Sequence, residues 1–356
     1  DASYRTRKDG GVMGPIVNST PWLQSNAIAG RYTDANFPGA PSYRAYVIGK
    51  AETPSVLWVG SNDGMLHGLN ALSGAPILSY VPSPLAGRLD AALSANNAGA
   101  VALMDGSPAT ADVLVAPTSP GFGLATPAQH EWRTYLFSSL GRGGRAVFAL
   151  DVSSPARLLN PLTATSAFKW VFSSNDDSDM GYQLLDHVRH PGSGQPAQVI
   201  YLNGGGFGLL VPNGHGSTDG RAALFILSVN GPASTGWQAS SATSRGSYRK
   251  ILVPDQSGGR NGLMGATWVD LDNNGTADVV YATDLRGNLW KFDIRSTNPA
   301  EWGSALVSTS TAEDGTRTNT GVPVALFSTQ IGDQFLPITT APVTFFPTFG
   351  GTMVSF

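Results

Sequence analysis

Short runs of apolar residues, each interrupted by a glycine turn, recur along this chain. One strand–turn–strand pattern covers residues 57–70, and others cover 135–151, 199–229 and 279–294; a fifth begins at Gly350. The turn glycines are Gly64, Gly144, Gly220, Gly287 and Gly351, so successive copies lie 80, 76, 67 and 64 residues apart. Apolar runs of this length, separated by turn residues, predict antiparallel β-hairpins.

Each hairpin is accompanied by further predicted strands. A strand of small residues is expected before each one, at 14–21, 105–112, 181–184, 262–267 and 337–342, and aromatic-rich strands follow at 77–80 and 168–172. Inner strand, hairpin and outer strand make a four-stranded propeller blade, so the sequence predicts an all-β, modified β-propeller. No amphipathic helix of convincing length is expected. The polar stretch 296–323 is predicted to be a solvated insertion.

Composition agrees with this fold class and excludes several functions. The 356 residues include 43 Gly and 24 Pro, and only 13% are charged. The net charge of −3, without a run of Lys or Arg, argues against nucleic acid as a partner. No apolar stretch approaches the roughly 20 residues of a membrane span. The absence of Cys excludes disulfides and thiolate chemistry. Without an initiating Met or a signal peptide, we expect a mature region or a fragment.

The strongest chemical signal is the nine-residue stretch 270–278. Oxygen-bearing side chains stand at its positions one, three, five and nine, which are Asp270, Asp272, Asn274 and Asp278. Hard cations such as Ca²⁺ take six to eight oxygen ligands, and Gly275 allows the sharp bend at position six. Thr276 offers its backbone carbonyl at position seven. Tyr281 stands where an EF-hand has Glu, so we predict an EF-hand-like calcium loop set between strands.

The alternative for the 270–278 loop is a plain hairpin turn at Asn274-Gly275 with incidental acids. Three carboxylates on one bend would repel each other without a cation, which favours the calcium loop.

Other acidic stretches provide weaker evidence for a metal site. Residues 175–179 place oxygens at Asn175, Asp177 and Asp179, which leaves a second cation site open, although loop acids are usually solvated. Asn62-Asp63-Gly64 is explained by a turn. A Ser-His-Asp triad cannot be argued from spacing, because triads are defined by geometry.

The order of these motifs resembles a known family. The stretches are 14–21, Tyr43-Arg44-Ala45-Tyr46, 59–67, Asp105-Gly106-Ser107-Pro108, 141–145, 179–182, the 270–278 loop and 284–293. Together they resemble the C-terminal propeller domain of the PilC/PilY family of type IV pilus tip-associated adhesins. The resemblance covers nearly the whole chain. Under it, residues 1–356 are one propeller of about seven blades, the C-terminal domain of a larger secreted protein, with the last blade incomplete or closed by the N-terminal strand.

The resemblance also implies a function. The family's calcium site matches Asp270, Asp272, Asn274, Thr276 and Asp278, although the family often has Asp where this chain has Asn274. It implies regulation of pilus extension and retraction, and so of twitching motility, together with attachment to surfaces or host cells. The implied partners are pilus components (minor pilins) and an extracellular surface or host receptor. The implied location is the bacterial outer surface, in association with the pilus.

Two other functions remain open from the residues. One is a general protein-interaction propeller in which calcium is purely structural. The other is a quinoprotein dehydrogenase, because the hairpins resemble its repeats; however, the chain has no adjacent Cys pair to cover the cofactor. We therefore expect a protein that is not an enzyme.

Overall fold

The described part of the chain is built mainly of antiparallel β-strands. A computed structural model describes residues 13–25, 32, 37, 40–90, 101–123, 130–183, 196, 198–254, 260–311, 313, 316–332, 334–348 and 350–356. The chain divides into two compact units: Asp1–Leu114, Glu131–Asn175 and Tyr182–Pro196 form unit 1, and Val115–His130, Asp176–Gly181 and Ala197–Phe356 form unit 2. Each unit has its own sheets and its own core.

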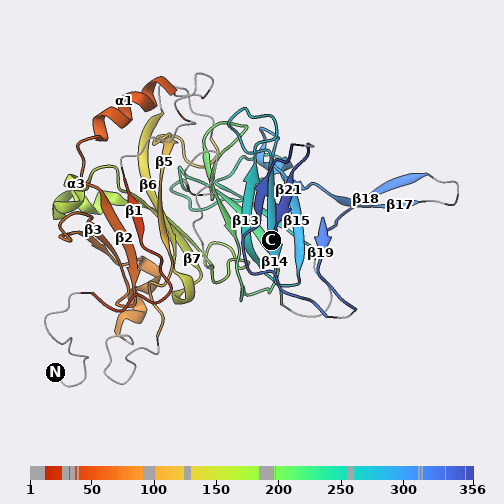
Figure 1. The fold of residues 1–356 in the computed structure, drawn as a ribbon, viewed down its shortest axis with the longest axis horizontal. Helices are drawn as coiled ribbons and strands as arrows, with labels where there is room; N and C mark the ends of the chain where they lie inside the picture. The colour runs from red at the N-terminus through yellow and green to blue at the C-terminus, as the bar shows by residue number, and fades with distance from the viewer. Residues whose placement is uncertain are drawn as a thin grey trace. The chain divides into compact units, whose positions relative to one another are not determined.

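Unit 1 contains two four-stranded sheets, each with its strands in sequence order (Figure 1). The first contains β1 (Trp22–Gln24), β2 (Val56–Ser61), β3 (Met65–Asn70) and β4 (Pro76–Tyr80). The second contains β5 (Pro108–Val115), β6 (Glu131–Ser139), β7 (Ala146–Asp151) and β8 (Phe168–Ser173). All six residues of β7 are buried, because both faces of that strand are covered.

Short helices connect the strands of unit 1. They are α1 (Ala40–Lys50), α3 (Pro155–Leu159), α4 (Pro161–Ala164) and the 3₁₀ turns η3 (Ser83–Arg88), η6 (Gly141–Gly143) and η7 (Thr165–Ala167). The sequence analysis expected no amphipathic helix of convincing length and did not anticipate the 11-residue α1. Its buried face consists of Tyr43, Val47 and Lys50, at the spacing of successive helical turns. The pattern is hard to recognise because one of the three is a lysine, whose ammonium binds the buried Asp112 at 2.6 Å.

Unit 2 contains one four-stranded sheet and one five-stranded sheet. One follows the same order, with β9 (Val199–Tyr201), β10 (Phe207–Pro212), β11 (Ala223–Ser228) and β12 (Tyr248–Leu252). The other contains β13 (Leu263–Val269), β14 (Val279–Asp284), β15 (Asn288–Asp293) and β16 (Gly303–Ser304), and β19 (Phe327–Ser328) also pairs with β15. A 3₁₀ turn, η8 (Pro299–Glu301), precedes β16. Their shared core includes Trp268, Trp290 and Trp302.

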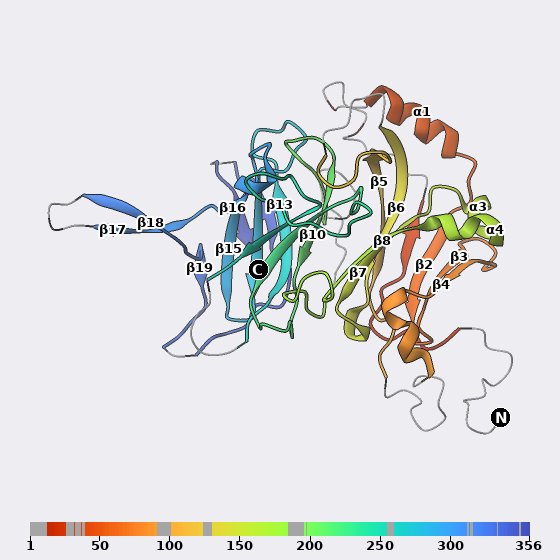
Figure 2. The ribbon, with the colours of Figure 1, turned by 180° about the vertical axis from the view of Figure 1, so that it is seen from behind.

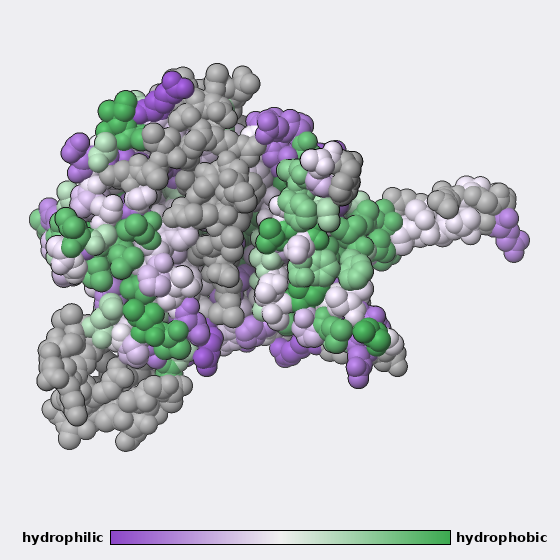
Figure 3. All heavy atoms as spheres, viewed as in Figure 1, coloured by the Kyte–Doolittle hydropathy of each residue, from purple (hydrophilic) through white to green (hydrophobic). Residues whose placement is uncertain are grey.

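Two separate hairpins complete the described part of unit 2. Strands β20 (Val343–Phe345) and β21 (Met353–Ser355) pair with each other; β21 lies in the fifth predicted pattern, which begins at Gly350, whereas β20 was not predicted. Strands β17 (Val307–Thr311) and β18 (Arg317–Pro323) form a second pair, which extends away from the other strands of unit 2 in both views (Figures 1 and 2). We call this hairpin the arm. Residues 322–356 carry many exposed apolar side chains, among them Phe327, Phe345 and Phe346. Hydrophobic surface gathers on unit 2 beside the arm (Figure 3).

The predicted hairpins are confirmed, and the strands beside them only in part. The pairs β2–β3, β6–β7, β10–β11 and β14–β15 are the four central hairpins. Stretches 105–112 and 262–267 overlap β5 and β13, but 14–21 and 337–342 are not strands, and no strand covers the described residues 181–183. Proline at both ends of 337–342 removes donors that a ladder needs. A blade number of about seven, and a single domain over 1–356, stay predictions.

Candidate metal centre

The loop 270–278 connects β13 to β14 in unit 2. Asp270 directly follows β13, and Asp278 directly precedes β14. The ends of the loop are joined at its base, because the Asp278 N–H donates to the Val269 carbonyl at 2.9 Å and Val269 pairs with Val279. The loop is therefore set between two strands of a buried sheet, as the sequence predicted.

The backbone of this loop is curled tightly. Asn273 has φ of 59° and Gly275 has φ of 97°, both in the left-handed region, which only glycine enters without strain. The curl directs backbone N–H groups at the acids. Asp270 accepts from the N–H groups of Asn274 (3.1 Å) and Gly275 (2.8 Å), and Asp278 accepts from that of Leu271 (2.7 Å). These bonds hold both carboxylates in place before any ligand arrives.

Three carboxylates meet in this loop. Asp270, Asp272 and Asp278 each offer a ligand atom, and these atoms all lie within 4.8 Å of one another. Asp278 is only 3% exposed, whereas Asp272 lies at the surface. Within the described part of the chain, neither Asp272 nor Asp278 forms an ion pair with Lys or Arg. Repulsion between these acids makes the cluster a good host for a cation.

Asn274 and Thr276, the two other predicted ligands, lie in the same curl. The Asn274 side-chain oxygen accepts from the Thr276 N–H at 2.8 Å, and its amide donates to Asp272 at 3.0 Å. The Thr276 hydroxyl donates at 2.9 Å to Asn203, which the sequence analysis did not identify. Asn203 precedes three glycines in a turn, so the sequence gives no signal that it contacts this loop.

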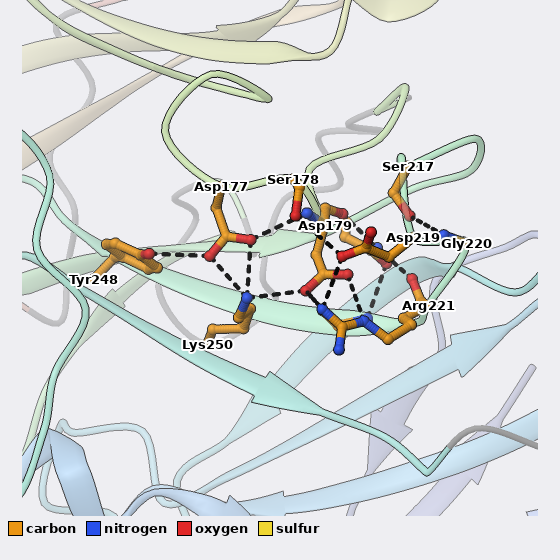
Figure 4. Close-up of polar contacts among 11 residues, drawn as sticks. Asp177, Ser178, Asp179, Ser217, Asp219, Gly220, Arg221, Tyr248 and Lys250 are labelled. Atoms are coloured by element: carbon orange, nitrogen blue, oxygen red, sulfur yellow. Dashed lines mark hydrogen bonds and ion pairs between the residues drawn. The ribbon is translucent and has the colours of Figure 1, made fainter.

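The second acidic stretch carries its own counter-ions (Figure 4). Arg221 contacts both oxygens of the fully buried Asp179, at 2.9 and 2.7 Å, and Lys250 contacts Asp177 and Asp179 at 2.9 Å each. The Tyr248 hydroxyl donates to Asp177 at 3.0 Å. Burial alone would lower the pKa of Lys250, but the hydrogen bonds that its ammonium donates to Asp179 and Asp177 outweigh burial and raise that pKa. These carboxylates are satisfied by protein groups, which argues against a cation there.

The Asn62-Asp63-Gly64 stretch is a hairpin turn between β2 and β3, with Gly64 at φ of 88°. His67 lies 3.0 Å from Asp63 through Nε2 and 2.9 Å from the Ser79 hydroxyl through Nδ1, which joins the turn to β4. Burial opposes ionisation of Asp63, yet hydrogen bonds from His67 and the Gly14 N–H lower its pKa to about 2. The hydrogen bonds of the Asp63 carboxylate therefore agree with a role in the turn.

Comparisons with known proteins agree with this fold. A family model of the PilY1 β-propeller domain matches residues 13–343. The chain is 30% identical over 328 residues to a type IV pilus biogenesis factor PilY1 homolog of Xylella fastidiosa, covering 90% of this chain and 19% of that protein. It is 29% identical over 294 residues to type IV pilus biogenesis factor PilY1 of Pseudomonas aeruginosa PAO1, covering 82% of this chain and 21% of that protein.

A solved structure has the same fold. The crystal structure of the P. aeruginosa PilY1 C-terminal domain superimposes with a TM-score of 0.63 and 25% identity, covering 96% of this chain and 58% of that one. The fold is that of a β-propeller domain from the type IV pilus system. The chain belongs to the PilY1 β-propeller family. It spans about a fifth of the length of these two curated relatives. Among the described residues, no helix is long and apolar enough to cross a membrane.

Proposed function

We propose that this chain is the calcium-binding propeller domain of a type IV pilus-associated adhesin. In this role it regulates pilus extension and retraction, and with them twitching motility, and contributes to attachment to a surface or a host cell. Its partners are minor pilins and an extracellular surface or receptor, and it acts at the bacterial outer surface. The observation that carries the proposal is the convergence of Asp270, Asp272 and Asp278 in one backbone-braced loop.

Calcium suits this donor set better than a transition metal does. Every side-chain donor in the loop is an oxygen, and carboxylates with carbonyls are the ligands that hard cations prefer. The proposed ligands are the side chains of Asp270, Asp272, Asn274 and Asp278 and the backbone carbonyl of Thr276. With Asn at position five and no Glu at position twelve, we expect a dissociation constant on the order of 10⁻⁶–10⁻⁴ M. Such a site would be filled at millimolar extracellular calcium.

Calcium titration of the purified protein tests this proposal. Calorimetry should detect uptake below millimolar calcium. Because calcium would bind the folded state, a concentration of ~100 times the dissociation constant should stabilise it by about 2.7 kcal/mol. Removing calcium with a chelator should therefore lower the melting temperature by a few degrees. Magnesium at the same concentration is the control. An absence of heat and of any thermal shift at millimolar calcium would refute the site.

The arm is the proposed contact for a partner. Ser and Thr make up half of the residues in its two strands, and long loops of a propeller are where binding residues usually lie. The longer segment 296–323 was predicted to be solvated throughout, but that is wrong at Trp302. This side chain is 1% exposed and packs edge-on against Phe122, with 5.5 Å between ring centroids.

Replacing residues 308–321 by a short Gly-Ser turn should weaken attachment or partner binding without unfolding the protein. Substitutions at exposed positions usually change stability by less than about 0.5 kcal/mol, so the melting temperature should hardly move. Adhesion assays and thermal denaturation measure the two effects. Deleting 296–323 is the contrasting variant, because losing buried Trp302 costs about 3–5 kcal/mol. Unchanged adhesion by the shorter deletion would exclude the arm as the contact.

A further inference from the structure

Asn203 joins the candidate metal loop to a different sheet of unit 2. It lies in the turn between β9 and β10, whereas the loop connects β13 to β14. Its side-chain oxygen accepts from the Thr276 hydroxyl at 2.9 Å. Its amide nitrogen donates to the Ala277 carbonyl at 3.0 Å and lies 3.4 Å from Asp278 Oδ1. One amide therefore contacts three consecutive residues of the loop.

The backbone supports the same connection. The Ala277 N–H donates to the Tyr201 carbonyl, the last residue of β9, at 2.8 Å. Ala277 is fully buried, so this segment of the loop cannot shift without disturbing the turn. The turn itself is closed by bonds from Leu202 N–H to the Gly206 carbonyl and from Gly205 N–H to the Leu202 carbonyl. The loop and the turn are thus joined by one network of hydrogen bonds.

We propose that Asn203 is a positioning residue for the cation loop, and that through it calcium in the loop orders the β9–β10 turn; this rests on the proposed calcium site. The reason is geometric. Thr276 and Asp278 are both proposed ligands, one through its carbonyl and the other through its carboxylate. Asn203 fixes the residue between them and contacts both. A cation bound by Thr276 and Asp278 would therefore also restrict Asn203 and the β9–β10 turn that contains it.

Asn203→Ala should weaken calcium binding by about tenfold, because removing a partner that orients metal ligands typically costs 10–100-fold in affinity. Calorimetry measures the affinity. The matched control is Asn230→Ala, which removes another turn asparagine with two hydrogen bonds, to Ala116 N–H at 2.9 Å and to Gly121 carbonyl at 3.2 Å. That variant should bind calcium like the wild type. Equal affinities of the two variants would overturn the positioning role.

Hydrogen exchange tests the link to the turn. In the wild type, calcium should slow amide exchange in both 270–278 and 201–207, whereas in Asn203→Ala it should slow exchange only in 270–278. Calcium protection of 201–207 that persists in the variant would overturn the link. Thr276→Val, which removes the hydroxyl at nearly constant shape, completes a double-mutant cycle. The affinity losses of Asn203→Ala and Thr276→Val should be less than additive, since both remove the Asn203–Thr276 bond at 2.9 Å, although Thr276→Val also removes the 2.5 Å contact of that hydroxyl with Asn274 Oδ1.

The two proposals fail differently. If the wild type takes up no calcium, the proposed site and the effect of calcium on the turn are both wrong. Hydrogen exchange in metal-free protein still tests whether Asn203 holds the loop in place. There, Asn203→Ala should speed exchange of the Ala277 amide, and Asn230→Ala should not. If the wild type binds calcium but Asn203→Ala binds equally well, the calcium site stands and the role of Asn203 is wrong.

Discussion

Asp278→Ala is expected to abolish calcium binding, with an affinity loss of at least about 100-fold. Asp278 is the most buried of the three carboxylates, at 3% exposure, and its second oxygen holds the Leu271 N–H at 2.7 Å. Alanine removes one charged ligand and also the bond that closes the curl. Loss of a ligand and of its supporting contact leaves too few oxygens for a cation that takes six to eight. Calorimetry and the calcium-dependent melting temperature measure the loss.

Two further variants make that result specific. Asp90→Ala removes an exposed acid of unit 1 and should leave calcium binding unchanged. Asn274→Asp adds a fourth carboxylate to the loop and should tighten binding. Normal calcium affinity in Asp278→Ala would mean that the cation binds elsewhere or that the loop is only a turn.

The same substitution separates a regulatory calcium from a structural one in piliated cells. If calcium regulates the pilus, cells that carry Asp278→Ala should export the protein normally yet differ in pilus number and twitching motility. Normal motility, with calcium binding lost in vitro, would favour a general interaction propeller with structural calcium only.

Asp284→Asn should destabilise unit 2 by about 3 kcal/mol, although the side chain keeps its size. Asp284 is fully buried at the end of β14. One oxygen accepts from the backbone N–H groups of Arg286 and Asn288 at 2.9 Å each, and the other from Asn261 at 3.0 Å and Trp290 Nε1 at 2.8 Å. Both oxygens face donors, so an amide would direct its NH₂ group at two of them. Thermal denaturation should show a fall of roughly 10 °C.

Asp293→Asn is the matched control, because it makes the same change in the same hairpin at a more exposed position. Asp293 contacts Arg295, whose side chain is 63% exposed. Exposed pairs of this kind contribute about 0–1 kcal/mol, so the melting temperature should change little. If both variants melt alike, the buried hydrogen bonds of Asp284 do not stabilise the hairpin as the geometry requires.

The sequence predicted the parts of this fold that depend on neighbours along the chain. The hairpin β14–β15 can be predicted because apolar runs flank Arg286-Gly287. The turn has a φ of 74° at Gly287, a backbone conformation that favours glycine. The candidate metal loop can be recognised because oxygen-bearing side chains stand at positions one, three, five and nine of nine consecutive residues. Both features are local, so their residue types and spacing carry the information.

What the sequence did not predict depends on contacts between distant residues. Asn203 meets Thr276 across 73 positions, and Lys250 meets Asp177 across the same separation. Without the fold, Asp177 and Asp179 resemble a loop of solvated acids, and their pairing with Lys250 and Arg221 is invisible. Trp302 likewise lies in a polar stretch, and only packing against Phe122 shows that it belongs to the core.

The order of strands in the sheets has a consequence for how the protein is made. In each four-stranded sheet every strand pairs with the next along the chain, so none of these sheets takes in a strand out of sequence order. Closing short loops costs little entropy, and contacts between nearby residues form quickly. Each sheet can therefore assemble soon after its own stretch of chain becomes available, in sequence order. A chain that becomes available progressively from its N-terminus would then fold one sheet after another.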